Sequence, residues 1–439
     1  MSKLKCLKKI FGSFGSYPPP ANGIADQKYM NSSPLARGKL NIENGYTYGV
    51  KREAASALHD LADLIYTDKQ TPKYRKGCTF KEMSDALFDV VMEFFDQSPA
   101  NIDANTVASI DGRIDSWFNT STTTTRPFIP CDITPYYVSS FAIGPVSFTH
   151  VDDFVQSIKE RIPFAFMLHQ MLEAMAQHAV CWIAELEIVD CSQKRADEIG
   201  NLTVDLALAV LQLILPSDNY SRVGRLNARR TPSINISVSL TQGNVTSGSR
   251  NQQPGRTISG EAFADILKAN KDIIESLSNR VNAFLSGHIT LPRLNESWSD
   301  AAYWFHEGIA EPLDTLAVPK LETAIEVLLR AVNSKGSETR INQAIRTFYG
   351  LEPDQFLAPD SLITVKQFSK SLVSDRSRLL HGTLSTLATD MRASRSSLTA
   401  LTHELLVHFS VELDHYEAAG QIVDDIDPFL DWIVARRNH

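Results

Sequence analysis

Apolar side chains recur every three or four residues along most of the chain. Leu58, Leu61 and Ile65 follow this spacing, which places side chains on one face of an α-helix. Residues 79–82 read Thr-Phe-Lys-Glu, the pattern of a capping box at the start of a helix. Further helices are predicted at about 104–118, 151–161, 164–188, 192–215 and 258–286, and from about 296. These patterns predict a mainly α fold.

Two segments interrupt the helical spacing. In residues 127–150, Phe141–Ile143 and Val146–Phe148 flank the turn-forming pair Gly144-Pro145, which is typical of one or two short strands. Residues 217–257 are polar and basic, with apolar residues at every second position in their middle. The second segment is either a hairpin insertion or a linker, and the alternation favours the hairpin.

The composition along the chain suggests three parts. Residues 1–48 are rich in Gly, Pro, Ser and Asn and carry several lysines near the start, so we expect a flexible basic tail. A short arm that touches a membrane surface or RNA is the alternative for this tail. Residues 49–290 are expected to form a mostly helical region, with a sensing or regulatory role, and residues 291–439 a helical bundle.

Charge and cysteine content narrow the classes of function. The 439 residues carry a net charge of −8, whereas proteins that coat nucleic acid by bulk electrostatics are usually basic. Any contact with RNA is therefore expected in a small basic cleft. The five cysteines contain no C-x-x-C pair, which indicates free thiols and a cytoplasmic location. The apolar run Leu206–Leu215 is shorter than the ~20 residues that span a bilayer, so no stable membrane insertion is expected.

The segment with the clearest chemistry is Arg376-Ser-Arg-Leu-Leu-His381. Metal-free RNA cleavage needs a group that takes the proton of a 2′-hydroxyl or protonates the leaving oxygen, and histidine titrates in the right range. It also needs a cation on the phosphate, and the guanidinium fork of arginine fits phosphate oxygens. His381 and an arginine of this segment are therefore candidate catalytic residues.

Helical geometry alone does not select Arg376. Each residue advances by about 100° around a helix, so Arg378 lies about 60° from His381 and Arg376 about 140° from it. Spacing thus favours Arg378 as the partner on the same face. The basic residues of 370–400 outnumber the acidic residues by five to two, which is what a restricted phosphate site in an acidic protein would show.

The last third of the chain carries four motifs in a fixed order: Ala-Ala-Tyr-Trp-Phe-His-Glu-Gly at 301–308, Leu-Glu-Thr-Ala-Ile-Glu-Val-Leu-Leu at 321–329, the arginine–histidine segment ending in His381-Gly382, and a leucine-rich helix at 398–406. This order of motifs resembles the Apea-like branch of the HEPN superfamily. The resemblance covers roughly residues 297–420. It implies a bundle of four or five helices over 291–439 and a homodimer in which two arginine–histidine helices share a cleft.

The resemblance also implies an activity and a set of site residues. Active members are metal-independent endoribonucleases, many of them in antiviral defence or toxin–antitoxin systems. On the family pattern Arg376 is the motif arginine, His381 the motif histidine and Glu326 the acidic residue that supports the site. Ser377, Arg378 and Lys370 are candidate contacts to the RNA substrate. A trigger or regulatory protein is a further expected partner.

Two alternatives stay open at this point. Ser377 stands where active members often carry Asn, Asp or His, and some HEPN domains are non-catalytic modules for dimerisation or interaction. The chain is therefore either an endoribonuclease or such a scaffold. No metal or cofactor is expected, because His403 and His408 are five residues apart and a zinc-binding helix needs its histidines four apart.

Overall fold

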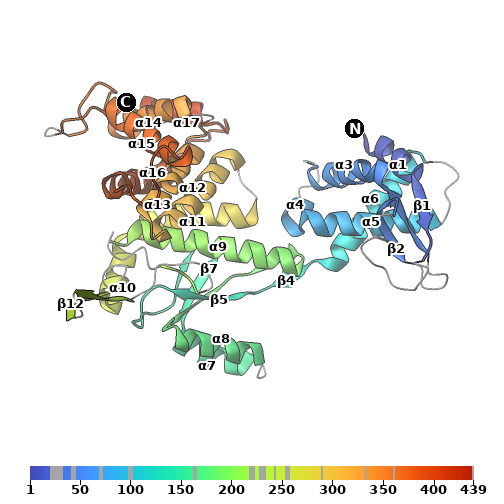
Figure 1. Cartoon of the computed structure of the whole chain (residues 1–439), viewed down its shortest axis with the longest axis horizontal. Coiled ribbons are helices and arrows are strands. Elements are labelled where there is room, and N and C mark those ends of the chain that lie inside the picture. The colour runs from blue at the N-terminus through green and yellow to red at the C-terminus, as the bar shows by residue number, and fades with distance from the viewer. Residues whose placement is uncertain are drawn as a thin grey trace. The chain divides into compact units, whose positions relative to one another are not determined.

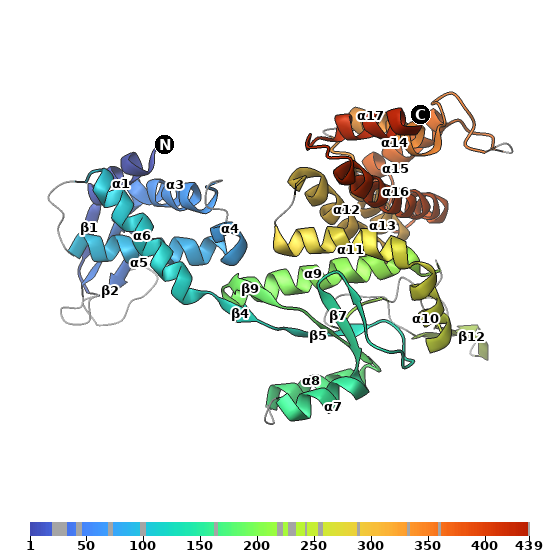
Figure 2. The same ribbon diagram turned by 180° about the vertical axis from the view of Figure 1, so that it is seen from behind.

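The fold is described from a computed structural model of the whole chain (Figures 1 and 2). The structure describes residues 1–19, 33–40, 46–68, 73–96, 102–161, 166–216, 223–226, 234–241, 244–252, 258–287, 290–331, 334–358 and 361–437. These residues form two compact units. The first comprises Met1–Thr125 and Glu187–Glu198, and the second comprises Arg126–Leu186 and Ile199–His439. The structure thus divides the chain at places other than the expected boundaries at 48 and 290.

The first unit packs helices against a small antiparallel sheet of strand order β1-β3-β2. Its core is one continuous cluster of buried apolar side chains from the helices and from β3. The elements are α1 (Lys3–Phe11), β1 (Phe14–Tyr17), β2 (Leu35–Leu40), β3 (Thr47–Lys51), η1 (Arg52–Ala54), α3 (Ala55–Tyr66), α4 (Lys73–Gly77), α5 (Phe80–Asp96), α6 (Ala104–Ser121), β4 (Thr123–Thr125) and β9 (Ile188–Cys191).

Helix α1 differs from the flexible tail expected over residues 1–48. Cys6, Leu7 and Ile10 lie on one face of this helix and are fully buried, and the helix packs against α3. The four lysines lie outside this buried face, and Lys3 forms an ion pair with Asp111 of α6. The burial of three apolar side chains offsets the entropy of ordering so short a segment.

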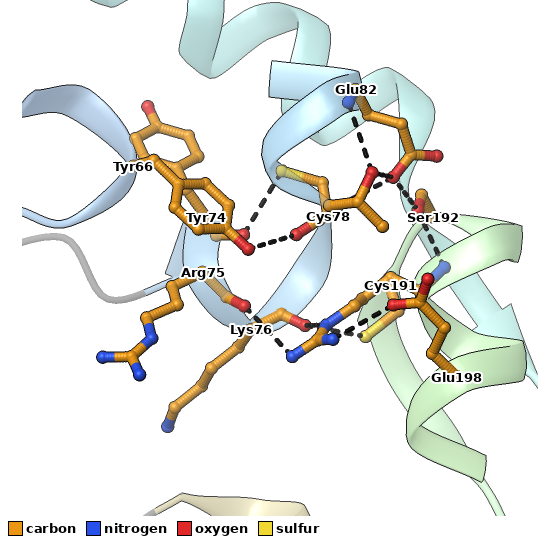
Figure 3. A network of polar contacts seen from close by, with 11 residues as sticks. Tyr66, Tyr74, Arg75, Lys76, Cys78, Glu82, Cys191, Ser192 and Glu198 are labelled. Atoms are coloured by element: carbon orange, nitrogen blue, oxygen red, sulfur yellow. Dashed lines mark hydrogen bonds and ion pairs between the residues drawn. The ribbon is translucent and has the colours of Figure 1, made fainter. Parts of the chain in front are cut away.

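A polar network fastens β9 and the start of α9 (Gln193–Ile214) to α4 and α5 within the first unit (Figure 3). Glu82 forms the predicted capping box with Thr79, since its carboxylate accepts from the Thr79 N–H at 2.8 Å, and it also accepts from the Ser192 hydroxyl at 2.9 Å. Arg195 donates to the backbone carbonyls of Arg75 and Lys76. These hydrogen bonds join residues 75–82 to residues 192–195, more than 100 positions later in the sequence.

The second unit begins with an antiparallel sheet of strand order β10-β5-β8-β7-β6. Gly144 allows the tight turn between β6 and β7, because its φ of 56° lies in the left-handed region. Helices α7 and α8 lie on one side of the sheet and α9 on the other in both views (Figures 1 and 2). The elements are β5 (Phe128–Asp132), β6 (Phe141–Ile143), β7 (Val146–His150), α7 (Val151–Arg161), α8 (Phe166–Gln177), β8 (Trp182–Glu185), β10 (Gly224–Arg225), β11 (Ile234–Thr241) and β12 (Asn244–Gln252).

The prediction of a helix over residues 164–188 is wrong for the second half of that range. Helix α8 ends at Gln177, and Trp182–Glu185 forms the central strand β8 of the five-stranded sheet. Trp182, Ile183 and Ala184 are all fully buried, so the strand shows a continuous apolar run instead of the alternation that identifies a half-buried strand. By contrast, β11 and β12 pair as the hairpin favoured for 217–257.

A helical bundle completes the second unit, and helix α13 runs through its middle. Helix α13 packs against α12, α14, α15 and α16, and α17 packs against α14 and α16. Figure 1 shows these helices gathered together, with α10 and α11 preceding them in the chain. The elements are α10 (Gly260–Ala269), α11 (Lys271–Ser286), α12 (Pro292–Ala310), α13 (Asp314–Leu328), α14 (Ser334–Tyr349), α15 (Val365–Leu380), α16 (Arg392–Ala418) and α17 (Ile426–Arg437).

Buried polar groups join neighbouring elements of this unit, helix to helix and helix to strand. Arg280 of α11 is 1% exposed and pairs with Asp414 of α16, while it also donates to Asn295 of α12 at 2.9 Å. Asp205 of α9 accepts two hydrogen bonds from the Arg225 guanidinium, at 2.7 and 2.8 Å. The mainly α fold class with a few short strands is confirmed. In the part of the chain that the structure describes, no helix is long and apolar enough to cross a membrane.

The packing of α1 predicts a cost for truncating its buried face. Leu7→Ala should lower the free energy of unfolding by roughly 2–5 kcal/mol, the usual range for such a truncation in a core. Chemical denaturation followed by circular dichroism measures this change. Lys8→Ala, at an exposed position of the same helix, is the matched control. An equal and small effect of both substitutions would restore the flexible-tail interpretation.

Candidate functional site

The arginine–histidine segment lies at the C-terminal end of α15. This helix starts at a capping box, in which Thr364 accepts from the Gln367 N–H and the Gln367 side chain accepts from the Thr364 N–H. It ends at Leu380, and the His381 N–H donates to the Ser377 carbonyl at 3.0 Å. Gly382 follows with a φ of 70°, a left-handed conformation that commonly terminates helices and favours glycine. The His-Gly pair is therefore the helix terminus itself.

Arg376 points from α15 toward α13. Its guanidinium Nη1 donates to Glu326 Oε1 at 2.8 Å, and the same carboxylate oxygen accepts from the Ser337 hydroxyl of α14. The Arg376 Nε lies 3.9 Å from Oε2 of Glu322, one turn earlier on α13. The structure thus brings together two of the predicted catalytic residues, Arg376 and Glu326.

Glu322 is a residue of this cluster that sequence reasoning missed. Its side chain is fully buried, and in the described part of the chain neither carboxyl oxygen has a hydrogen-bond partner. Burial raises the pKa of this carboxyl to about 8, although the charge of Arg376 acts in the opposite direction. The available signal was a glutamate four residues before Glu326 inside an otherwise apolar helix, because such spacing places both carboxyl groups on one face.

The remaining predicted residues do not join the Arg376 cluster. His381, Arg378 and Lys370 are exposed, and Ser377 is half-buried. A separation of five residues places Arg376 and His381 about 140° apart around α15, so Arg376 faces α13 while His381 lies on the surface. Exposed apolar residues precede and follow His381 in the sequence, since Leu380 is 62% and Leu387 is 86% exposed.

The basic character expected for residues 370–400 is largely neutralised. Arg392 pairs with Asp390 at 2.6 Å, which lowers the pKa of that carboxyl to about 2. Arg395 pairs with Asp314 of α13 at 2.9 Å and also donates to the Ile309 carbonyl. Together with the pairing of Arg376, this leaves Lys370 and Arg378 as the cations of the segment that make no ion pair within the described ranges.

A cleft of about 700 Å³ opens beside Glu326. Three arginines contribute to its wall: Arg293, Arg330 and Arg340. Arg330 follows α13 with a φ of 53°, and its guanidinium donates to the Arg293 carbonyl at 3.2 Å. The cleft gives solvent a route to the Glu326 carboxylate, whose side chain is 14% exposed.

Comparisons with known proteins give no relative for this chain, since no family model, no curated protein and no solved structure matches it. Its candidate chemistry therefore depends on the residues themselves.

The raised pKa of Glu322 predicts a specific pH dependence of stability. Its pKa of about 8 in the folded state exceeds the ordinary value of 4.5, so the folded state binds this proton more tightly than the unfolded state. The resulting stabilisation is fully present below pH 4.5 and is lost as the pH rises to 8. Glu322→Gln should match the wild type in thermal midpoint at pH 4.5 and exceed it by at least roughly 2 °C at pH 8. A constant difference at both pH values, measured by calorimetry, would contradict the assignment.

Proposed function

We propose that the chain is a metal-independent endoribonuclease of the HEPN type whose site lies at the end of α15. The observation that carries the proposal is the pairing of Arg376 with Glu326, together with an exposed His381 at the end of the same helix α15. An arginine, a supporting carboxylate and a titratable imidazole are the residue types that the resemblance to Apea-like HEPN domains requires. They come from two separate motifs of the sequence.

The chemistry is a transesterification within the RNA strand. The 2′-hydroxyl oxygen attacks the adjacent phosphorus, a new P–O2′ bond forms, and the P–O5′ bond breaks. His381 takes the proton of the 2′-hydroxyl or gives a proton to the departing 5′ oxygen, and water makes the other proton transfer, so that the proton lost at O2′ is balanced by the proton gained at O5′. Arg376 neutralises the charge that develops on the phosphate oxygens. The products are a 2′,3′-cyclic phosphate and a 5′-hydroxyl.

A second copy of the chain completes the proposed site. Arg376 and His381 lie on different faces of α15, so one helix alone does not surround a phosphate. Leu380, directly before His381, and Leu387, six residues after it, are both exposed, and apolar side chains of this kind favour association with another surface. In a two-fold dimer through this end of α15, Arg378 of one copy would lie near the site of the other. We place the RNA in that shared groove.

The scaffold alternative has one observation in its favour. The Arg376 guanidinium is engaged by carboxylates of its own bundle, which also describes an arginine that only holds two helices together. The two functions differ in what His381 does, because a scaffold does not need an exposed imidazole. Both functions require the same bundle.

RNA cleavage separates the two functions directly. The full-length protein should cleave single-stranded RNA in the presence of EDTA and leave a 2′,3′-cyclic phosphate end. His381→Ala and Arg376→Ala should each slow cleavage by about 10²- to 10⁴-fold, the usual size for loss of an acid–base group or of an oxyanion contact. Arg378→Ala should have a smaller effect. No cleavage by the wild-type protein would leave the scaffold function, equal cleavage by all three variants would reject this site, and complete loss in EDTA would reject the mechanism.

The dimer makes a second prediction. Leu387→Glu should convert a dimer to a monomer in multi-angle light scattering at micromolar concentration, because a buried carboxylate would oppose the interface. Ile422→Glu, at a similarly exposed position, is the matched control and should leave the dimer intact. A wild-type monomer that still cleaves RNA would refute the shared groove.

A further inference from the structure

The exposed residues of helix α1 are all lysines. Lys5, Lys8 and Lys9 are exposed, and an advance of about 100° per residue places all three within an arc of about 100° around the helix. The opposite side is the buried apolar face of α1, and the helix packs against α3. These three residues form a lysine face on the surface of the first unit.

Other cations in this part of the chain are neutralised by acids. Residues 1–52 contain nine lysines and arginines but only two acidic residues. Lys3 pairs with Asp111 of α6 at 2.9 Å, and Arg37 and Lys39 of β2 pair with two aspartates of α5. The lysine face makes no ion pair with any residue that the structure describes. Its positive charge therefore faces solvent.

The lysine face is unfavourable for α1 itself. Like charges three and four residues apart, as from Lys5 to Lys8 and to Lys9, destabilise a helix. The helix dipole favours cations in the last turn, which accounts for Lys8 and Lys9 but not for Lys5 in the first turn. Lys51 adds another cation nearby, since its N–H donates to the Ser13 carbonyl at 3.1 Å, just beyond the end of α1. A bound polyanion would relieve this repulsion.

The burial of the apolar face favours a nucleic acid over a membrane as that polyanion. A helix that lies on a membrane surface inserts its apolar side among the lipids, but in α1 the apolar side is fully buried in the protein core. What remains outside is a purely cationic surface. Such a surface fits the phosphates of a nucleic-acid backbone, from which lysines release bound counterions.

We propose that the lysine face of α1 binds the phosphate backbone of RNA, as a contact in addition to the candidate site on α15. The contact is independent of base sequence, because phosphates fix the position of a strand and carry no sequence information directly. The choice of RNA as the polyanion rests on the proposed function, whereas the lysine face itself does not require RNA cleavage.

The salt dependence of RNA binding tests the lysine face. A fluorescein-labelled single-stranded RNA is titrated with full-length protein carrying His381→Ala, so that it is not cleaved, and the dissociation constant is measured by anisotropy. Changing all three lysines of the face to Gln should weaken binding by roughly tenfold or more at about 50 mM KCl. The slope of log Kd against log [KCl] should fall by about 2, since each phosphate contact on a single strand contributes about 0.7.

A matched control removes the same charge from elsewhere. It changes three exposed lysines on three other helices to Gln: Lys81 of α5, Lys194 of α9 and Lys271 of α11. This control should bind RNA as the parent does, with the same salt dependence. The thermal midpoint of the lysine-face variant should not fall below that of the parent, because the substitutions remove a repulsion and no buried contact.

Equal RNA affinity of the lysine-face variant and the control would overturn the proposal. Co-sedimentation with vesicles of phosphatidylcholine and phosphatidylserine gives a second outcome. Vesicle binding that requires the lysine face, without any effect of the face on RNA binding, would assign it to a membrane and also overturn the proposal. RNA binding that requires the lysine face, in a wild-type protein that does not cleave RNA, would support the proposal and reject only the ribonuclease.

Discussion

A carboxyl group buried on the central helix of the bundle constrains the helices around it. Helix α13 packs against α12, α14, α15 and α16, so a charged side chain on its inner face cannot reach solvent. Burial therefore keeps Glu322 protonated up to about pH 8, and Arg376 of α15, 3.9 Å away, pairs with Glu326 instead. The same solution recurs where Arg280 of α11 pairs with Asp414 of α16. Ion pairs across helices thus fix which faces of the bundle meet, because an unpaired buried charge is strongly destabilising.

This constraint also decides where the candidate chemistry lies. Once Arg376 is directed toward α13, the five-residue spacing turns His381 about 140° away around α15. The helix ends at Leu380, and Gly382 leaves it in the left-handed conformation. The imidazole is consequently placed at a helix terminus on the surface, directly after the exposed Leu380. An arginine held inside the bundle and a histidine presented outside it are the basis for the shared groove that we propose.

Local patterns predicted much of the fold but little of the pairing inside the site. The helical period identified α5 and α9, and the capping box at Thr79 formed as expected, because both depend on neighbouring residues. Strand β8 was missed, since burial on both faces removes the alternation that marks a strand. Helix α1 was missed because its nine residues acquire their stability from contacts with α3.

Local sequence patterns also predicted the candidate site only in part. Helical spacing favoured Arg378 as the partner of His381, whereas the resemblance to HEPN domains selected Arg376 and Glu326. The structure joins Arg376 to Glu326, 50 residues apart in the sequence, and leaves Arg378 exposed. The periodicity within one helix carries no information on contacts between residues that are so far apart in the sequence. Glu322 was visible only as a glutamate in an apolar helix, and its burial depends on four other helices.

Attack by the 2′-hydroxyl is the step on which the proposed ribonuclease activity depends most directly. The decisive measurement is cleavage by the full-length wild-type protein of two otherwise identical RNA oligonucleotides, one of which carries a single 2′-deoxy nucleotide at the mapped cleavage position. Mass spectrometry of the products reports both the position and the chemistry of the new ends. The account predicts a 2′,3′-cyclic phosphate from the unmodified strand and no cleavage at the deoxy position. Cleavage of both strands at that position would contradict it.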